Sequence, residues 1–309
     1  MDLPLPTSER AARSAAAEAR RDPKLRIEAT LDAALRLCAG EGAPPTLAAA
    51  MRYAVFPGGA RIRPRLCLGV AMACGEGAPE IAEGAAAAIE LMHCASLVHD
   101  DLPCFDDAST RRGKISVHRA FGEPLAVLAG DGLIVLAFQA LARGAAIAPD
   151  RLVGLLEVVA AATGMPGGIV AGQAWESEPE IDLSHYHRAK TGALFSAATR
   201  AGALAAGGDP KPWRALGELI GEAYQVADDL HDFASEEAEI GKPVGQDAAH
   251  GRASAVASLG VEGAIDRLEG LVSAAKDSIP DCAGAADLRA LIGASSERFV
   301  PKSLARFAA

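Results

Sequence analysis

Apolar residues recur every three or four positions along most of this chain, the spacing that places them on one face of an α-helix. This pattern predicts helices over residues 24–40, 47–55, 65–75, 79–99, 123–142, 150–165, 167–178 and 212–233. A further helical stretch of small residues follows His185, and two or three more helices are expected before the chain ends. Apolar and polar residues do not alternate over any useful length, and the sequence contains no internal repeat. The sequence therefore predicts an all-α fold.

Composition supports this fold class and limits the classes of function. Half of the 309 residues are hydrophobic but only 4% are aromatic, so the core must be built from Ala, Leu, Val and Ile, which favours closely packed helices. Residues 1–23 are polar and rich in Ala and Arg, and we interpret them as an N-terminal arm before a single domain over residues 24–309. The formal net charge of -10 argues against a general role in binding nucleic acid, which requires a basic surface.

The cysteines and the apolar runs indicate the cellular location to expect for the protein. None of the six cysteines forms a C-x-x-C pair or has a zinc-binding spacing, and the N-terminus lacks the apolar core of a signal peptide. Asp131 and several glycines interrupt the longest apolar run, so no continuous apolar run reaches the roughly 18 residues that a membrane span needs. We therefore expect reduced thiols, no membrane span and a cytoplasmic location.

Four aspartates and two arginines crowd into one short stretch of the chain. They are Asp100, Asp101, Asp106, Asp107, Arg111 and Arg112. So many carboxylates at short range are costly unless a cation neutralises them, and the basic pair beyond them suggests a polyanionic ligand that bridges metal and arginine. Taken alone, one such motif is as readily a solvated surface or a helix cap.

A second acidic cluster far along the chain makes metal binding the stronger of these interpretations. Asp228, Asp229 and Asp232 lie in YQVADDLHDF, where the spacing puts Asp228 and Asp232 one turn apart on one helical face with Asp229 beside them. Mg2+ prefers oxygen ligands and is usually held by a few carboxylates together with substrate phosphates. Two such clusters could grip one diphosphate from both sides.

Other candidate anion-binding residues are weaker when taken alone. Two glycines in the segment GGARIRP, residues 58–64, would let backbone N–H groups approach an anion, and Arg61 and Arg63 follow at once. Such a loop is more often simply solvated. His93 by itself is typical of a core histidine, but it lies seven residues before Asp100, two turns back on the same helical face.

Taken together, these motifs resemble those of the polyprenyl diphosphate synthases, the enzymes of trans-isoprenyl chain elongation. DDLPCFDDASTRRG is similar to the family's first aspartate-rich motif, DDxxxxD with its RRG, and ADDLHD is similar to the second, DDxxD. GGARIRP resembles GGKRxRP, KTGALF resembles the KT motif, and GKPVGQD resembles GKxxGxD. The likeness covers roughly residues 28–300 in the family's order. It implies an isoprenoid-synthase-type helical bundle around a deep central cavity, Mg2+ as cofactor and a homodimer.

The resemblance also implies a reaction, in which isopentenyl diphosphate is joined to an allylic diphosphate. The allylic diphosphate ionises to an allylic cation, C4 of isopentenyl diphosphate attacks that cation, and the departing diphosphate can take the proton that is lost. Positive charge must therefore stabilise the leaving group, while an aliphatic pocket keeps water from the cation.

Family roles can be carried over residue by residue. The implied metal ligands are Asp100, Asp101, Asp106, Asp228, Asp229 and Asp232. The residues implied to bind isopentenyl diphosphate are Arg63, His93 and Arg112, and those implied to hold the allylic diphosphate are Arg111, Lys190, Thr191, Gln225 and Lys242. Of these, Arg111, Lys190 and Lys242 would assist the metal in stabilising the leaving group. Ala60 stands where the family usually has the lysine of GGK, and Arg61 is the residue that could replace its phosphate contact.

Product length should depend on the helix that leads into Asp100. The residues that would set it are Ile89, Met92, Ala95 and Ser96. Ala95 and Ser96 are small where farnesyl-forming relatives tend to have an aromatic residue, so a growing tail could pass them. Together with the extension Pro103-Cys104 in the first motif, this resembles bacterial geranylgeranyl diphosphate synthases and implies a C20 product.

Several alternatives remain open at this point. The chain could be a farnesyl diphosphate synthase, or, because of Ala60, a non-catalytic subunit of a heteromeric prenyl synthase. A class I terpene cyclase typically mixes Asn, Ser or Thr with Glu in its second metal motif, whereas ADDLHD contains only aspartates as acidic residues. A head-to-head synthase would resemble paired DxxxD motifs. Both acidic motifs are intact, which favours chain elongation.

Overall fold

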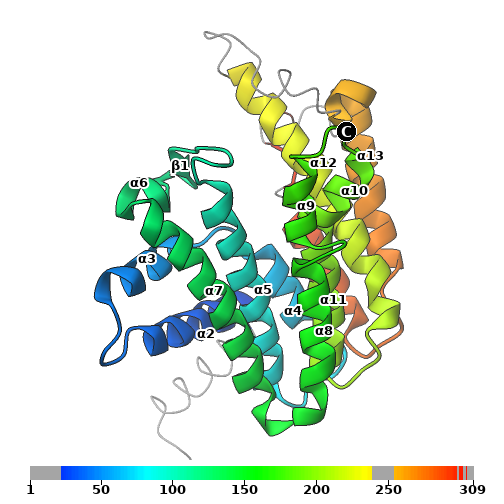
Figure 1. The fold of residues 1–309 in the computed structure, drawn as a ribbon. Coiled ribbons are helices and arrows are strands. Elements are labelled where there is room, and N and C mark those ends of the chain that lie inside the picture. The colour runs from blue at the N-terminus through cyan, green and yellow to red at the C-terminus, as the bar shows by residue number, and fades with distance from the viewer. Residues whose placement is uncertain (1–21, 239–253, 298, 302–303, 305–309) are drawn as a thin grey trace, which may run out of the picture. The chain divides into compact units, whose positions relative to one another are not determined.

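The computed structural model describes residues 22–238, 254–297, 299–301 and 304. The chain divides into two compact units. The first comprises Met1–Leu68 and Pro79–Pro149, and the second comprises Gly69–Ala78 and Asp150–Ala309. The described residues are helical apart from turns, loops and two very short strands, which confirms the all-α prediction (Figure 1).

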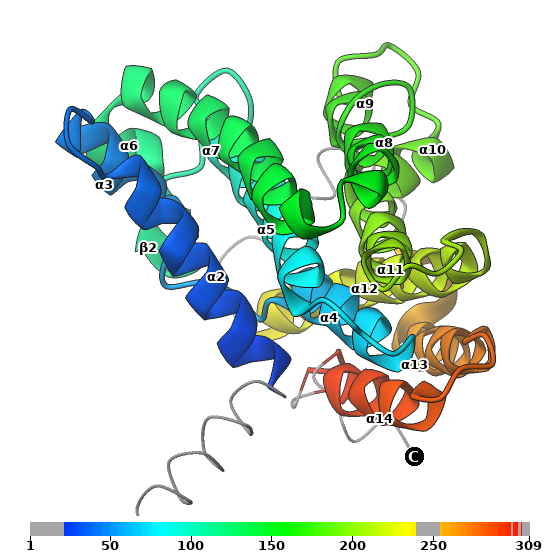
Figure 2. The ribbon, with the colours of Figure 1, turned by 90° about the horizontal axis from the view of Figure 1, so that it is seen from below.

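The first unit is built on two long antiparallel helices with shorter helices around them. Its helices are α2 (Pro23–Cys38), α3 (Pro45–Val55), the first part of α4 (Ile62–Ala73), α5 (Pro79–Asp100), α6 (Val117–Phe121) and α7 (Glu123–Gly144), followed by a 3-10 turn at Ala145–Ile147. Figure 2 shows α5 and α7 side by side. Glycine permits this close approach, because a Cβ at Gly84 would lie 2.7 Å from the carbonyl oxygen of Ala140 and 3.0 Å from the Cα of Gly144.

A short hairpin follows the first aspartate-rich motif and was not predicted from the sequence. Strands β1 (Thr110–Arg111) and β2 (Lys114–Ile115) pair antiparallel, with Arg111 opposite Lys114. The two turn residues Arg112 and Gly113 have φ of 53° and 72°, the left-handed pair that a two-residue type I′ turn requires. Two residues per strand are too few for an alternating pattern, so the hydrophobic signal could not reveal them.

The second unit contains the remaining helices. They are α8 (Leu152–Thr163), α9 (Ile169–Trp175), α10 (Leu183–His187), α11 (Ala193–Ala205), α12 (Arg214–Ala238), α13 (Ala255–Asp277) and α14 (Ala285–Ser296), with 3-10 turns at Pro149–Arg151 and Lys211–Trp213. A π-helical turn, Arg188–Gly192, joins α10 to α11. Helix α12 packs against α11 and α13. Cβ atoms at Gly172 and Gly221 would lie 2.4 Å from the Lys190 backbone nitrogen and 2.9 Å from the Gly192 Cα, so these glycines let α9 and α12 approach the π-helical turn.

Most predicted helices are confirmed, and their ends shift by a few residues. Helix α4 begins at Ile62, three residues before the predicted start, because Pro64 is tolerated in a first turn where its missing N–H has no partner to lose. Helix α6 was not predicted.

Of the arm predicted over residues 1–23, all but Asp22 and Pro23 lies outside the described residues. The Asp22 side chain caps α2 by accepting a hydrogen bond from the Lys24 backbone nitrogen at 2.8 Å. The single-domain assignment for residues 24–309 stays a prediction.

Two helices are long and apolar enough, by length and composition alone, to cross a membrane. They are Pro79–Asp100 and the continuous helical stretch Glu123–Ile147. The most apolar part of the first is 78% buried within the protein and that of the second 44%. Core helices of soluble proteins meet the same criterion, so this is weak support for a membrane span.

Candidate active site

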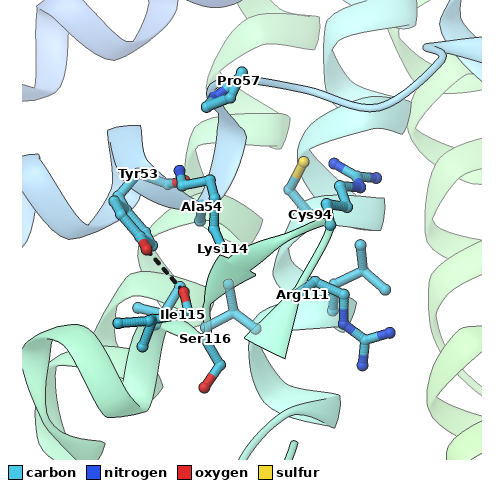
Figure 3. A pocket seen from close by; sticks show the side chains of 12 residues that line it. Tyr53, Ala54, Pro57, Cys94, Arg111, Lys114, Ile115 and Ser116 are labelled. Atoms are coloured by element: carbon cyan, nitrogen blue, oxygen red, sulfur yellow. Dashed lines mark hydrogen bonds between the residues drawn. The ribbon is translucent and has the colours of Figure 1, made fainter. Parts of the chain in front are cut away.

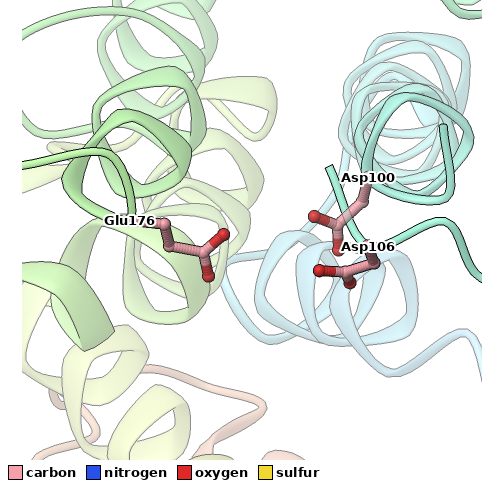
Figure 4. A group of neighbouring side chains, drawn as sticks. All are labelled: Asp100, Asp106 and Glu176. Carbon is pink, nitrogen blue, oxygen red and sulfur yellow. The ribbon is translucent and has the colours of Figure 1, made fainter. Parts of the chain in front are cut away.

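The first aspartate-rich motif folds back on itself at the end of α5. Asp100 is the last residue of the helix, and the Asp106 backbone nitrogen donates a hydrogen bond to the Asp100 carbonyl at 3.0 Å. Their carboxylate oxygens consequently lie within 4.8 Å of each other (Figure 4). Asp100 is half-buried and Asp106 exposed. Two oxygen ligands that leave room for water suit a hard cation such as Mg2+. Figure 4 also draws Glu176, which belongs to the second unit and is described below.

Asp101 is the buried member of this motif. Its side chain is 3% exposed, and the Nε atom of Arg111 donates to its Oδ1 at 2.8 Å, with a second contact from Nη2. Burial raises the pKa of Asp101, and the hydrogen bond and charge of Arg111 oppose that rise. Asp101, a predicted metal ligand of the first unit, is thus paired with Arg111.

The hairpin turn sends two consecutive arginines to different partners. Arg111, in β1, reaches Asp101, whereas the Nη2 atom of Arg112, in the left-handed turn, lies 3.2 Å from Nε2 of His93. Arg63 approaches the same His93 nitrogen at 3.5 Å through its Nη1 atom. The structure therefore brings together the three residues that the sequence predicted for isopentenyl diphosphate, namely Arg63, His93 and Arg112.

The protonation state of His93 follows from these neighbours. A guanidinium can only donate hydrogen bonds, so Nε2 of His93 must accept and the neutral ring must carry its proton on Nδ1. Desolvation of the half-buried ring, followed by the charges of Arg63 and Arg112, lowers the pKa of His93 well below its ordinary value. Two cations held around one neutral acceptor provide a place where an anion would be stabilised.

Arg61 lies elsewhere, inside a carboxylate cage. Its side chain is 0% exposed, its Nε donates to Glu28 at 2.8 Å, and its Nη1 donates to Glu90 at 2.6 Å. Its Nη2 donates to the Val55 carbonyl at 2.8 Å. Burial alone would lower the pKa of Arg61, but the two carboxylates outweigh it and the pKa is raised. The predicted replacement of the missing lysine contact by Arg61 finds no support in this arrangement, because all three guanidinium nitrogens already have partners.

A small pocket beside the hairpin shows how the hairpin is fixed to α3. Its lining includes Tyr53, Arg111, Arg112 and Lys114 (Figure 3). The Tyr53 hydroxyl donates to the Ile115 carbonyl at 2.8 Å. The Lys114 ammonium donates to the carbonyls of Tyr53 and Phe56 at 3.1 and 2.8 Å, and burial lowers its pKa. These bonds hold the turn that carries Arg112.

In the second unit, a carboxylate missed by the sequence analysis contacts Lys190. Oε1 of Glu176, at the end of α9, accepts from the Lys190 ammonium and from the Tyr186 hydroxyl, each at 2.6 Å. The Gln173 amide donates to the other oxygen, Oε2, at 3.1 Å. Glu176 therefore fixes the position of Lys190, which the sequence predicted as a phosphate ligand.

The second aspartate-rich motif is connected to the KT motif through Gln225. The Thr191 hydroxyl donates to the Gln225 amide oxygen at 3.2 Å, and the Gln225 amide nitrogen donates to Asp229 at 3.3 Å. Asp229 also accepts from the Ala255 backbone nitrogen at 2.7 Å, at the start of α13. Asp228 and Asp232 are one turn apart on α12, half-buried and exposed respectively. Lys242 lies outside the described residues.

The predicted chain-length residues all lie on α5. Ile89, Met92 and Ala95 are at most 1% exposed, so they belong to the interior of the first unit. Ser96 is half-buried and donates its hydroxyl hydrogen bond to the His93 carbonyl at 2.8 Å. Their burial fits residues on the apolar side of α5, and their role in product length stays a prediction.

Three carboxylates that contact candidate site residues were not identified from the sequence. For two of them the sequence does contain a signal. Glu90 is the one acidic residue between Glu83 and Asp100, in an otherwise apolar helical stretch, which indicates a buried partner. Glu176 likewise comes directly after a mostly apolar stretch, IVAGQAW, which also indicates a partner for its charge. Glu28 belongs to an ordinary amphipathic helix and gave no such signal.

Comparisons with known proteins identify the family of the chain. The family model described as Polyprenyl synthetase matches residues 44–283. The chain is 56% identical over 280 residues to a protein of Cereibacter sphaeroides named geranylgeranyl diphosphate synthase, covering 91% of this chain and 97% of that protein. A protein of Rhodobacter capsulatus with the same name is 53% identical over 267 residues, covering 86% and 92%.

Solved structures give the same result for the fold. A farnesyl/geranylfarnesyl diphosphate (FPP/GFPP) synthase from Zymomonas mobilis superposes with a TM-score of 0.73 at 32% identity, covering 90% of this chain and 99% of that one. A geranyltransferase from Legionella pneumophila superposes with a TM-score of 0.76 at 28% identity, covering 91% and 96%.

Proposed function

Since the chain belongs to the polyprenyl synthetase family, we propose that it condenses isopentenyl diphosphate with an allylic diphosphate in a Mg2+-dependent chain elongation. The observation that carries this proposal is the grouping in the first unit. The neighbouring carboxylates of Asp100 and Asp106 occur in the same unit as Arg63, His93 and Arg112, a second group suited to an anion.

The first unit would bind the nucleophilic substrate, isopentenyl diphosphate, and would supply some of the metal ligands. Arg63 and Arg112 neutralise the diphosphate of isopentenyl diphosphate, and His93 keeps their guanidinium groups together. Arg111, fixed by Asp101, presents its remaining donors to the allylic diphosphate. Asp100 and Asp106 would hold Mg2+, and bound Mg2+ supplies positive charge that stabilises the departing diphosphate.

The second unit would bind the allylic diphosphate and its metal. Lys190, oriented by Glu176, donates to phosphate oxygens, and Thr191 and Gln225 add neutral donors. Asp228, Asp229 and Asp232 form its acidic metal-binding set, and we assign Lys242 to the same diphosphate on the family resemblance alone. The C1–O bond of the allylic diphosphate breaks, C4 of isopentenyl diphosphate bonds to C1, and the proton lost from C2 goes to the released diphosphate.

The product that fits best is the C20 geranylgeranyl diphosphate. Small residues at positions 95 and 96 of α5, and the names of the two relatives above, support this length. A relative from Geobacillus stearothermophilus that is named farnesyl diphosphate synthase is 41% identical, so C15 is the length against which C20 must be tested.

We further propose a soluble, cytoplasmic homodimer. Helix α7 exposes Val127, Leu128 and Val135, large apolar side chains at helical spacing that a second copy could cover. Light scattering during gel filtration would give the mass, and a monomer at micromolar concentration would refute this part.

The decisive experiment combines starter and product. Purified protein is incubated with Mg2+, isopentenyl diphosphate and, in turn, dimethylallyl, geranyl and farnesyl diphosphate, and the dephosphorylated products are sized. A C20 alcohol supports the proposal. Mainly C15 refutes the product assignment, and no product from any starter in folded protein refutes the proposed activity in favour of a non-catalytic subunit.

A further inference from the structure

The segment between α3 and α5 places two arginines in register with two side chains of α5. Arg61 pairs with Glu90, and Arg63, two residues later, reaches His93, one helical turn later on the same face. Arg61 has a left-handed φ of 52° and Arg63 is the second residue of α4, and this two-residue step matches one turn of α5. Whatever fixes Arg61 on Glu90 also fixes where Arg63 meets His93.

The two glycines before Arg61 make room for guanidinium groups. A Cβ at Gly58 would lie 2.0 Å from the Cζ of Arg61, and one at Gly59 would lie 3.2 Å from the Cζ of Arg112. The sequence suggested that these glycines expose backbone N–H groups to an anion. In the structure each glycine instead has an arginine side chain against it, one buried and one at the candidate diphosphate site.

Arg61 is held strongly enough to serve as a fixed point. Its backbone has φ of 52°, a left-handed conformation that is unfavourable for a residue with a side chain. Glu28 of α2, Glu90 of α5 and the last carbonyl of α3 together occupy its guanidinium, which also lies 5.5 Å from the centre of the Phe56 ring. These partners come from three helices, so Arg61 connects all three to the start of α4.

We propose that Arg61 is a positioning residue for the isopentenyl diphosphate site, which acts through Arg63 and Arg112 and does not contact the substrate. This inference rests on the proposed function. It assigns phosphate binding, in the absence of the usual lysine at Ala60, to Arg63 and Arg112, and it assigns to Glu28 and Glu90 the task of keeping Arg61 in place.

The test compares substitutions in this cage with a matched ion pair. Arg26 and Glu83 also connect α2 to α5, with Nε and Oε1 2.9 Å apart and an arginine side chain that is 6% exposed. Arg26 also donates to the Pro79 carbonyl at the start of α5, at the opposite end of that helix from Asp100. Arg61→Lys, Glu90→Gln and Glu28→Gln are measured beside Arg26→Lys. Each full-length protein is assayed for initial rate at saturating allylic diphosphate and Mg2+ with isopentenyl diphosphate varied, and for stability by urea unfolding.

We expect Arg61→Lys and Glu90→Gln to raise the KM for isopentenyl diphosphate about tenfold, as is usual when a residue that orients a ligand-binding side chain is changed. The KM for the allylic diphosphate should stay within about twofold, and Arg26→Lys should lower stability without changing either KM. Glu28→Gln removes the more exposed partner, so it should fold and show a smaller shift in the same direction.

Two results would overturn the inference. A lower KM in Glu90→Gln would mean that release from the cage lets Arg61 bind substrate directly. Unchanged KM values in all three cage variants, with stability losses like that of Arg26→Lys, would mean that Arg61 is only structural. Lack of turnover by the wild-type protein would instead refute the proposed function, and this inference with it.

Discussion

The neutral state of His93 should make the protein lose stability in mild acid. Its folded-state pKa is lowered by desolvation and by Arg63 and Arg112, so the unfolded chain binds the His93 proton more readily than the folded one. The contribution of His93 is therefore complete above the unfolded pKa of about 6.5 and is lost as the pH falls below it. If the folded ring stays neutral at pH 5.5, the expected loss is about 1.4 kcal/mol for this one group.

His93→Gln separates this effect from those of all other titrating groups. Glutamine does not titrate and keeps an acceptor oxygen for the two arginines. The free energy of unfolding in urea would be measured at pH 7.5 and 5.5, at one protein concentration, for wild type and variant. Wild type should lose about 1.4 kcal/mol more than the variant between these two values.

The reasoning would be refuted if both proteins lost the same stability to within about 0.3 kcal/mol, the usual scatter of such differences. A direct check is the NMR signal of the His93 ring, which should not titrate down to pH 5.5 in the free enzyme. Added isopentenyl diphosphate should bring the titration back toward neutral pH, because an anion between the arginines cancels the charges that lower the pKa.

Three further predictions follow from the packing and the proposed site. Gly84→Ala should destabilise the protein by about 1–3 kcal/mol, because its Cβ would meet the Ala140 carbonyl oxygen at 2.7 Å. Gly77→Ala, whose Cβ would meet nothing within 4 Å, is the control, and equal unfolding free energies for the two variants would contradict the argument. Ala95→Tyr should shift the main product from C20 to C15 in the sizing assay, and an unchanged C20 product would show that this position does not set length. Asp100→Asn should lower turnover at saturating Mg2+ by about a hundredfold, and EDTA should abolish wild-type turnover; a rate within a few fold of wild type would remove Asp100 from the metal site.

The helical segments and the acidic motifs were predictable because their signals are local. Apolar spacing follows the helix period, so α5 and α7 could be identified within a few residues of their ends. The i, i+1, i+4 spacing of Asp228, Asp229 and Asp232 placed them together without knowledge of any other helix. The hairpin at residues 110–115 was missed, because its strands are too short for a period and its turn uses an arginine at positive φ.

The partners of long side chains were not predictable, because distant backbone decides them. Arg61 and Arg63 look alike in GGARIRP, yet one is enclosed by Glu28 and Glu90 and the other reaches His93. No local pattern distinguishes them.

By itself, the sequence determined an all-α chain, two aspartate-rich motifs and the set of cations that accompany them, since each depends on spacing along one segment. Only the tertiary structure decided which side chain each of these cations contacts. Gly58 leaves space for the Arg61 side chain, and Glu176 at the end of α9 holds Lys190. The left-handed backbone of Arg112 directs its side chain to a different partner from that of Arg111. The physical reason is that a charge in a packed interior is stabilised by partners brought from other helices, so its role is fixed only when those helices are in place.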